Sequence, residues 1–200
     1  MRRALLGFCA TALLVQISAA ADAPQYTADN RIVIPPSYRE WIFLTSSLDL
    51  NYDKAVPGAA GMPSLLDNVF VSPSSYAQFA QTGHWPEGTV LVKENRIAAS
   101  AGTISKSGKY QTTVASMELH VKDARFATGW AFFFSDGKKP GQYVPASEDC
   151  YSCHSEHGAV DTTFVQFYPT MLQIATAKGT LAPGYLKDRA ALAGKPQDKQ

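Results

Sequence analysis

The chain has little net charge, few cysteines and no apolar run long enough to cross a membrane. Its 18 lysines and arginines nearly balance 17 aspartates and glutamates, so the net charge is +1. This balance argues against nucleic acid or an anionic membrane as a partner. No segment approaches the roughly 20 consecutive apolar residues that a membrane span requires. We also find no internal repeat and no low-complexity tract.

The first 21 residues have the pattern of a secretory signal peptide. Arg2 and Arg3 form a short basic region, residues 4–15 form an apolar stretch, and residues 18–21 are the small side chains that a signal peptidase needs. We therefore expect export and cleavage near Ala21. The mature chain then has roughly 180 residues, which suits one domain with a core large enough to enclose a cofactor.

One short motif late in the chain carries recognisable chemistry. Cys150, Cys153 and His154 have the C-x-x-C-H spacing at which two thiols bond the vinyl groups of a haem and the imidazole ligates its iron. A thioredoxin-type disulfide would sit early in a β-α-β unit, and a zinc site would need a fourth ligand. Cys9, the remaining cysteine, lies in the expected signal peptide. The motif therefore predicts one haem c, held by two thioethers and attached in the periplasm.

Helix and strand signals alternate along the first part of the chain. Ser37 and Glu40 have the spacing of a capping box, which predicts a helix over residues 37–46. A loop rich in glycine, alanine and proline follows over residues 51–63, and residues 67–71 are typical of a strand.

The middle of the chain changes from helical to strand periodicity. Ser72 followed by Pro73 predicts the start of a helix that runs through Phe79, and Gly83 ends it. After it come three runs rich in β-forming residues, at 89–97, 112–122 and 130–134. With residues 67–71, these runs predict a small antiparallel sheet.

The C-terminal part is expected to be helical. The haem motif should lie on a helical turn before Gly158, and Asp161 or Thr162 can cap a final helix. That helix would carry Phe164, Phe167, Tyr168, Met171 and Leu172. After Lys187 we expect a polar, loosely held tail.

The predicted fold class is therefore α+β, a small antiparallel sheet with helices packed on it and a single covalent c-type haem near the C-terminus. A class I cytochrome c carries its haem motif near the N-terminus of a helical fold. A four-helix cytochrome c′ would need helices where this chain has strands. Neither fits the order of elements.

Five stretches of the chain together resemble the cytochrome P-460 family, which includes the β-sheet cytochromes called c′-beta. These stretches are residues 38–41, 85–90, 121–123, 128–132 and 150–154. The resemblance implies a five-coordinate haem c on an antiparallel sheet, often in a homodimer. It divides the chain into a signal peptide (1–21), an N-terminal lead-in (22–36), a cytochrome P-460-like haem domain (37–175) and a polar tail (176–200).

The resemblance also implies a choice between two kinds of member. Those called P-460 oxidise hydroxylamine to nitric oxide or nitrous oxide and have a lysine bonded to the porphyrin edge, whereas c′-beta members lack this bond and bind nitric oxide in an apolar pocket. Lys93 is the candidate lysine, because strand alternation places it with Leu91, opposite Val90 and Val92. Alternatively, Lys93 and Glu94 form a solvated pair at the strand end.

Glu118 is the candidate proton acceptor for such an oxidation. Alternation places it on one face of its strand with Ser116 and His120. A carboxylate partly desolvated beside a haem can accept a proton near neutral pH. The alternative is that this face is simply the polar, water-facing side of a half-buried strand.

No residue stands out as a sixth ligand of the iron. His157 follows His154 too closely to reach the opposite face of the same haem. The other candidates are His84, His120, Met62, Met117 and Met171. We therefore expect an open distal site, guarded by rings such as Phe70 or Phe79.

Two classes of function remain at this point. The first is an oxidoreductase, with His154 on the iron, a small nitrogen compound as substrate, Glu118 taking protons, Lys93 modifying the macrocycle and a soluble periplasmic redox partner taking electrons. The second is a haem protein that captures nitric oxide or transfers electrons without turnover. A homodimer is possible in either class.

Overall fold

The computed structural model describes residues 22–50, 52, 63–104 and 106–193. The expected signal peptide with Cys9, nearly all of the loop expected over 51–63, and Met62 lie outside the described residues. Among the described helices, none is long and apolar enough to cross a membrane.

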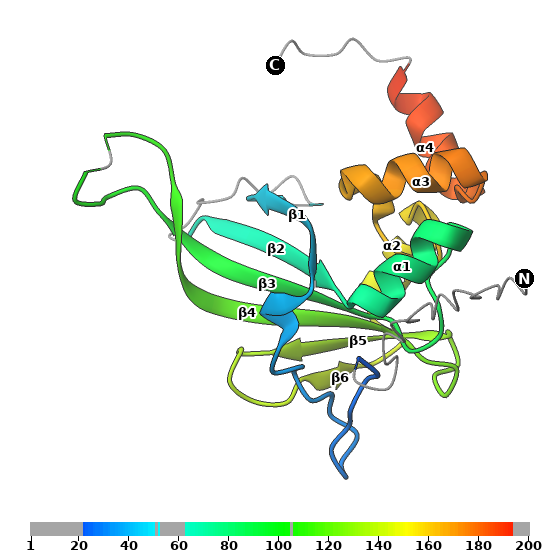
Figure 1. Ribbon diagram of the computed structural model, residues 1–200, viewed down its shortest axis with the longest axis horizontal. Helices are drawn as coiled ribbons and strands as arrows, with labels where there is room; N and C mark the ends of the chain where they lie inside the picture. Colours follow the sequence, from blue (N-terminus) through cyan, green and yellow to red (C-terminus); the bar gives the residue numbers. More distant parts are fainter. Residues whose placement is uncertain (1–21, 51, 53–62, 105, 194–200) are drawn as a thin grey trace, which may run out of the picture.

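The described residues form an antiparallel sheet whose strands pair in chain order, so the predicted antiparallel sheet is confirmed (Figure 1). The strands are β1 (Ile42–Leu48), β2 (Leu65–Val71), β3 (Val90–Ala99), β4 (Tyr110–Lys122), β5 (Trp130–Ser135) and β6 (Gln142–Val144). A β-bulge interrupts β1 between Phe43 and Thr45. The four predicted strand runs lie within or overlap β2 to β5.

The helices gather on one side of the sheet, whereas the joined ends of β3 and β4 reach away from them (Figure 1). They are α1 (Pro73–Thr82), α2 (Asp149–His157), α3 (Pro169–Lys178) and α4 (Pro183–Ala193). The predicted limits of α1 are confirmed. The Ser75 N–H donates to Ser72 Oγ, and Gly83 ends the helix at a φ of 79°, a left-handed conformation that suits glycine.

The helix predicted over residues 37–46 is wrong. Only Tyr38–Glu40 form a short 3-10 turn (η2), and the chain then enters β1. Ser37 makes no side-chain capping bond. Pairing with β2 satisfies the backbone from Ile42 onward, and this tertiary pairing overrides the local helix signal.

Two expectations for the C-terminal part are also wrong. Asp161 and Thr162 do not cap a helix, because both have left-handed backbone angles in a turn. Phe164 precedes a 3-10 turn, η4 (Val165–Phe167), and α3 begins later, at Pro169. Lys187 lies within α4, so helix continues where a loose tail was expected.

The sheet is covered on both faces. One apolar cluster lies between the sheet and the helices and contains Val69, Val71, Phe79, Trp85, Leu91, Trp130 and Met171 among others. The second lies on the far face, where the N-terminal segment contributes Ile32, Tyr38 and Trp41 against the buried side chains of β3, β4 and β5. Successive residues of β3 therefore enter different clusters, Leu91 the first, Val90 and Val92 the second.

Glu94 is the buried charge of the far face. Its side chain is 1% exposed and contacts Tyr38, Arg39 and Arg96. Burial alone would raise the pKa of Glu94, but the hydrogen bonds from Arg96 and Tyr38 and the two guanidinium charges outweigh burial and hold this pKa below its usual value. The carboxylate is therefore ionised and paired at neutral pH, and the suggested solvated pair of Lys93 with Glu94 is wrong.

We expect Arg96→Met to lower the free energy of unfolding by about 3 kcal/mol, because it leaves Glu94 buried with less compensation. The matched control is Arg31→Met, which breaks an exposed pair with Asp29 and should cost far less. Urea unfolding at pH 7 measures both. Equal losses for the two variants would contradict the importance of burial at Glu94.

Candidate functional site

A cavity of about 280 Å³ lies between the helix side of the sheet and the segment that follows α2. Its walls are mostly apolar and aromatic. The part of the cavity lined by Asp67, Lys93 and Glu118 is polar. The lining residues are Thr45, Ser46, Ser47, Leu50, Tyr52, Asp67, Val69, Leu91, Lys93, Glu118, Leu119, His120, Phe132, His154, Phe164, Phe167 and Tyr168. Such a composition is typical of a pocket for a largely apolar ligand.

The strand register explains which side chains enter the cavity. Lys93 pairs with Val69 on one side and with Glu118 on the other. In the neighbouring row, His120 pairs with Leu91 and Phe132. Since opposite residues in a sheet share a face, both rows point toward the helices. The predicted placement of Lys93 beside Leu91, and of Glu118 beside His120, is confirmed as a matter of position.

The three residues of the haem motif lie on α2. Cys150, Cys153 and His154 are spaced three and four residues apart, so they are neighbours on the surface of the helix. The helix ends where the Gly158 N–H donates to the carbonyl of His154. Neither sulfur is in a disulfide. Burial raises the pKa of the Cys150 thiol, whereas a thioredoxin-type cysteine needs a lowered pKa, so the structure does not favour that alternative.

The His154 ring is neutral and is hydrogen-bonded through one of its two nitrogens. Its Nδ1 lies 2.8 Å from the carbonyl oxygen of Thr162, and because a carbonyl can only accept, Nδ1 carries the hydrogen. The lone pair is then on Nε2. Burial lowers the pKa of His154 to about 4, although the Thr162 carbonyl opposes this, so the ring is neutral at pH 7. A neutral imidazole with its other nitrogen bonded to a carbonyl is the usual form of a metal-ligating histidine.

His120 lies beside His154 in the same wall. Its ring stacks on Phe132 at 4.0 Å and meets the His154 ring edge-on at 5.0 Å between centroids. Burial lowers its pKa well below 6.5. Among the described residues, nothing bonds its buried Nε2. A buried nitrogen without a hydrogen-bond partner, in the cavity wall beside His154, is consistent with a cavity that receives a ligand.

The contact between the two histidine rings also excludes one arrangement. A macrocycle cannot lie between rings that touch, so His120 is not placed to ligate the iron from the face opposite His154. The other histidines bind acids elsewhere, His84 at Asp161 and His157 at Asp188. Met117 and Met171 are buried in the two apolar clusters.

The polar part of the cavity contains both candidate catalytic residues. Lys93 Nζ lies 3.2 Å from Glu118 Oε1, which also accepts a hydrogen bond from Asn95 Nδ2 at 2.9 Å. The Glu118 side chain is 45% exposed, so it lines the cavity and also reaches water. The position of Glu118 is therefore compatible with both hypotheses, that of a proton acceptor and that of a water-facing strand residue. The catalytic roles of Lys93 and Glu118 stay predictions.

Asp67 is a cavity residue that the sequence did not single out. It is 6% exposed, and its hydrogen bond from Ser47 Oγ is long, at 3.4 Å. Desolvation raises its pKa, the positive charge of Lys93 opposes the rise, and the negative charge of Glu118 adds to it. The sequence did contain one signal for this residue, because Asp67 lies at a position of β2 whose strand alternation is otherwise apolar, with Leu65 and Val69.

The prediction that rings such as Phe70 or Phe79 guard the distal site is wrong. Phe70 packs edge-on against Tyr38 and Phe43, on the other face of the sheet, and Phe79 packs against Trp85 in the core. The rings that line the cavity are Tyr52, Phe132, Phe164, Phe167 and Tyr168. Phe164 stacks on the His154 ring at 4.0 Å between centroids.

In the comparison with protein families, the model described as Cytochrome P460 matches residues 35–165. This range includes β1 to β6, α2 and the cavity residues up to Phe164, whereas Phe167 and Tyr168 follow it. None of the curated proteins compared with the chain matches it.

We expect Asp67→Asn to stabilise the protein at pH 7 but not at pH 3. The folded-state pKa of Asp67 is raised, so stability is complete below the ordinary value of 3.8 and is lost as pH rises through the folded pKa. Asparagine removes that loss. Urea unfolding midpoints at both pH values measure it.

The matched control is Asp136→Asn. The pKa of Asp136 is lowered, chiefly by backbone hydrogen bonds from Lys138 and Lys139, so its contribution is present above the ordinary pKa and lost in acid. This variant should therefore be less stable than the parent at pH 7. An Asp67→Asn variant that is destabilised equally at pH 3 and pH 7 would refute the effect of burial.

Proposed function

Because the chain belongs to the cytochrome P460 family, which makes it a c-type haem protein, we propose that it oxidises small nitrogen compounds, hydroxylamine above all, to nitric oxide or nitrous oxide. The observation that carries the proposal is the cavity. It joins an aromatic wall containing a neutral, partly buried His154 to a polar part that holds Lys93, Glu118 and Asp67.

The residues present fit a haem. In this proposal Cys150 and Cys153 form the two thioethers and His154 Nε2 ligates the iron. The rings of Phe132, Phe164 and Tyr168 supply flat apolar surfaces of the kind that pack on a macrocycle. A haem held there would supply the redox chemistry, through which electrons of the substrate could reach a soluble redox partner.

The side chains of the polar part would handle the protons. Every hydrogen of hydroxylamine leaves as a proton when it is oxidised to nitric oxide, so a base must be within reach of the substrate. Glu118 is the proposed acceptor, since it lines the cavity and also reaches water, to which it can release protons. Asp67, buried and with a raised pKa, can hold a proton nearby.

Lys93 is the proposed site of a bond to the edge of the macrocycle. Its Nζ lines the cavity and lies 3.2 Å from Glu118 Oε1, so the amine is beside the space that the macrocycle would occupy. The location of this chemistry is proposed to be the periplasm, after export through residues 1–21, because haem attachment at this motif takes place outside the bacterial cytoplasm. A homodimer is part of the proposal as well.

One observation favours a second function. Lys93 Nζ lies 3.2 Å from Glu118 Oε1 in the structure, and an amine held in that ion pair is not available for the bond. A protein with Lys93 unbonded and mostly apolar cavity walls would bind nitric oxide or transfer electrons without turnover, as proposed for c′-beta-like members.

We expect the ferrous absorption spectrum of protein matured in a bacterial periplasm to show a Soret band displaced far to the red, with one covalent haem by intact mass. Lys93→Arg should restore an ordinary haem c spectrum, because arginine keeps the positive charge beside Glu118 but cannot form the bond. An ordinary high-spin spectrum in the parent protein would favour the nitric-oxide binder. An ordinary low-spin spectrum would indicate a sixth protein ligand and electron transfer.

We expect Glu118→Gln to lower kcat for hydroxylamine oxidation by about 100-fold with haem content intact, because an amide cannot accept the proton. Glu156→Gln, on an exposed side chain of α2, is the control and should leave kcat unchanged. Steady-state assays with a soluble electron acceptor measure both. Unchanged turnover in Glu118→Gln would remove this residue from the mechanism.

A further inference from the structure

The turn that follows α2 holds the carbonyl to which His154 is bonded. Within it, Asp161 has a φ of 48° and Thr162 a φ of 59°. Left-handed angles are uncommon outside glycine and are least favourable for a β-branched residue such as Thr162. Strained backbone of this kind persists only where its surroundings hold it. The question is therefore what holds this turn.

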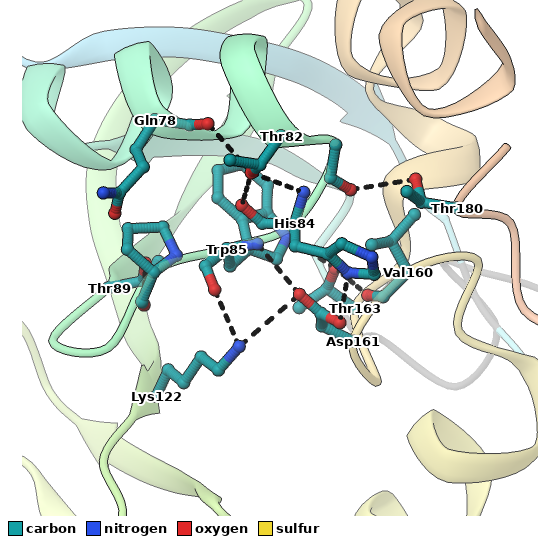
Figure 2. A network of polar contacts seen from close by, with 12 residues as sticks. Gln78, Thr82, His84, Trp85, Thr89, Lys122, Val160, Asp161, Thr163 and Thr180 are labelled. Carbon is teal, nitrogen blue, oxygen red and sulfur yellow. Dashed lines mark hydrogen bonds and ion pairs between the residues drawn. The ribbon is translucent and has the colours of Figure 1, made fainter. Parts of the chain in front are cut away.

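The Asp161 side chain ties the turn to the start of the loop before β3 (Figure 2). Its Oδ2 accepts the backbone N–H of Trp85 at 2.8 Å, and its Oδ1 lies 2.9 Å from His84 Nδ1. Lys122 Nζ, from the end of β4, donates to the carbonyl of Trp85 at 2.7 Å and lies 3.5 Å from Asp161 Oδ2. One carboxylate thus joins the turn to both neighbouring segments.

Thr163 holds the other side of the turn. It is fully buried, its Oγ1 accepts the indole N–H of Trp85 at 2.9 Å, and it donates to the carbonyl of Val160 at 2.6 Å (Figure 2). Trp85 is itself 1% exposed and packs on Phe79 at 4.2 Å between centroids. Thr162 is therefore fixed from both sides, by Asp161 before it and Thr163 after it, against one buried tryptophan.

We propose that Asp161 is a positioning residue for the axial ligand. Through Trp85 and Lys122 it fixes the turn, the turn aims the Thr162 carbonyl at Nδ1 of His154, and that hydrogen bond sets how strongly the imidazole binds iron. The inference rests on the proposed function, since it requires that His154 ligates a haem. Hydrogen bonding to the second nitrogen raises ligand basicity, and a more basic ligand favours ferric over ferrous iron.

The test is the midpoint potential of the haem-loaded protein with Asp161→Gly. Glycine accepts the left-handed angle and lacks the carboxylate, so it separates the side-chain bonds from the backbone conformation. We expect the preference of the site for ferric over ferrous iron to fall about tenfold, a rise in potential of about 59 mV for one electron. The iron–histidine stretching frequency of the ferrous protein should fall with it. Asp161→Asn keeps an acceptor for the Trp85 N–H and should shift both values less.

Asp188→Asn is the matched control. It removes a carboxylate whose Oδ2 lies 2.6 Å from Nδ1 of His157, a residue on the same helix as His154. Among the described residues, this carboxylate makes no hydrogen bond to the turn. It should leave the potential and the stretching frequency unchanged. If Asp161→Gly does not accumulate, Lys122→Gln, which cuts the tie to β4 but keeps the Asp161 to Trp85 bond, should raise the potential in the same direction.

The outcomes separate the two proposals. The positioning role is overturned if Asp161→Gly has covalent haem by intact mass but an unchanged potential and an unchanged stretching frequency. The same holds for Lys122→Gln where that variant replaces Asp161→Gly. Either result leaves the proposed function intact. A shift of equal size in Asp188→Asn also overturns it, since any change near α2 would then suffice. Wild-type protein without covalent haem overturns the proposed function, and the positioning role with it.

Discussion

The antiparallel register of β3 with its two neighbours is the constraint on which the rest of the site depends. Val90, Val92 and Glu94 enter the far face, whereas Leu91, Lys93 and Asn95 face the helices. A slip of one residue would exchange these sets and bury Lys93 in the wrong cluster. The apolar side chains on both faces therefore fix the register, and the register brings the polar cavity residues together.

The buried carboxylates on the two faces of the sheet have different surroundings, and their pKa values are shifted in opposite directions. On the far face, Glu94 is fully surrounded by a tyrosine and two arginines, and its pKa is lowered. On the cavity face, Asp67 is buried, its hydrogen bond from Ser47 is long, and its pKa is raised. A buried carboxylate with charged partners is costly to deprive of a partner, whereas one in a cavity with a raised pKa is a candidate for chemistry.

The opposite wall of the cavity depends on the contacts of a single turn. α2 places two thiols and an imidazole together by helical spacing alone, but the direction of the imidazole depends on the Thr162 carbonyl. That carbonyl is held through Asp161, which precedes it, and through two distant segments, around Trp85 and at Lys122. The two walls are thus linked at the end of β4, which carries Glu118 and His120 on one side and Lys122 at its end.

Local signals in the sequence determined the haem motif, the strands β2 to β5, the limits of α1 and the face on which Lys93, Glu118 and His120 lie, because caps, alternation and motif spacing act over a few residues. Only the tertiary structure decided the rest. Residues 42–46 became a strand because β2 was available to pair with them, and Asp161 became part of a turn because Trp85 and Lys122 bind its carboxylate. The rings around the cavity come together by contacts between segments far apart in the chain, which no local pattern records.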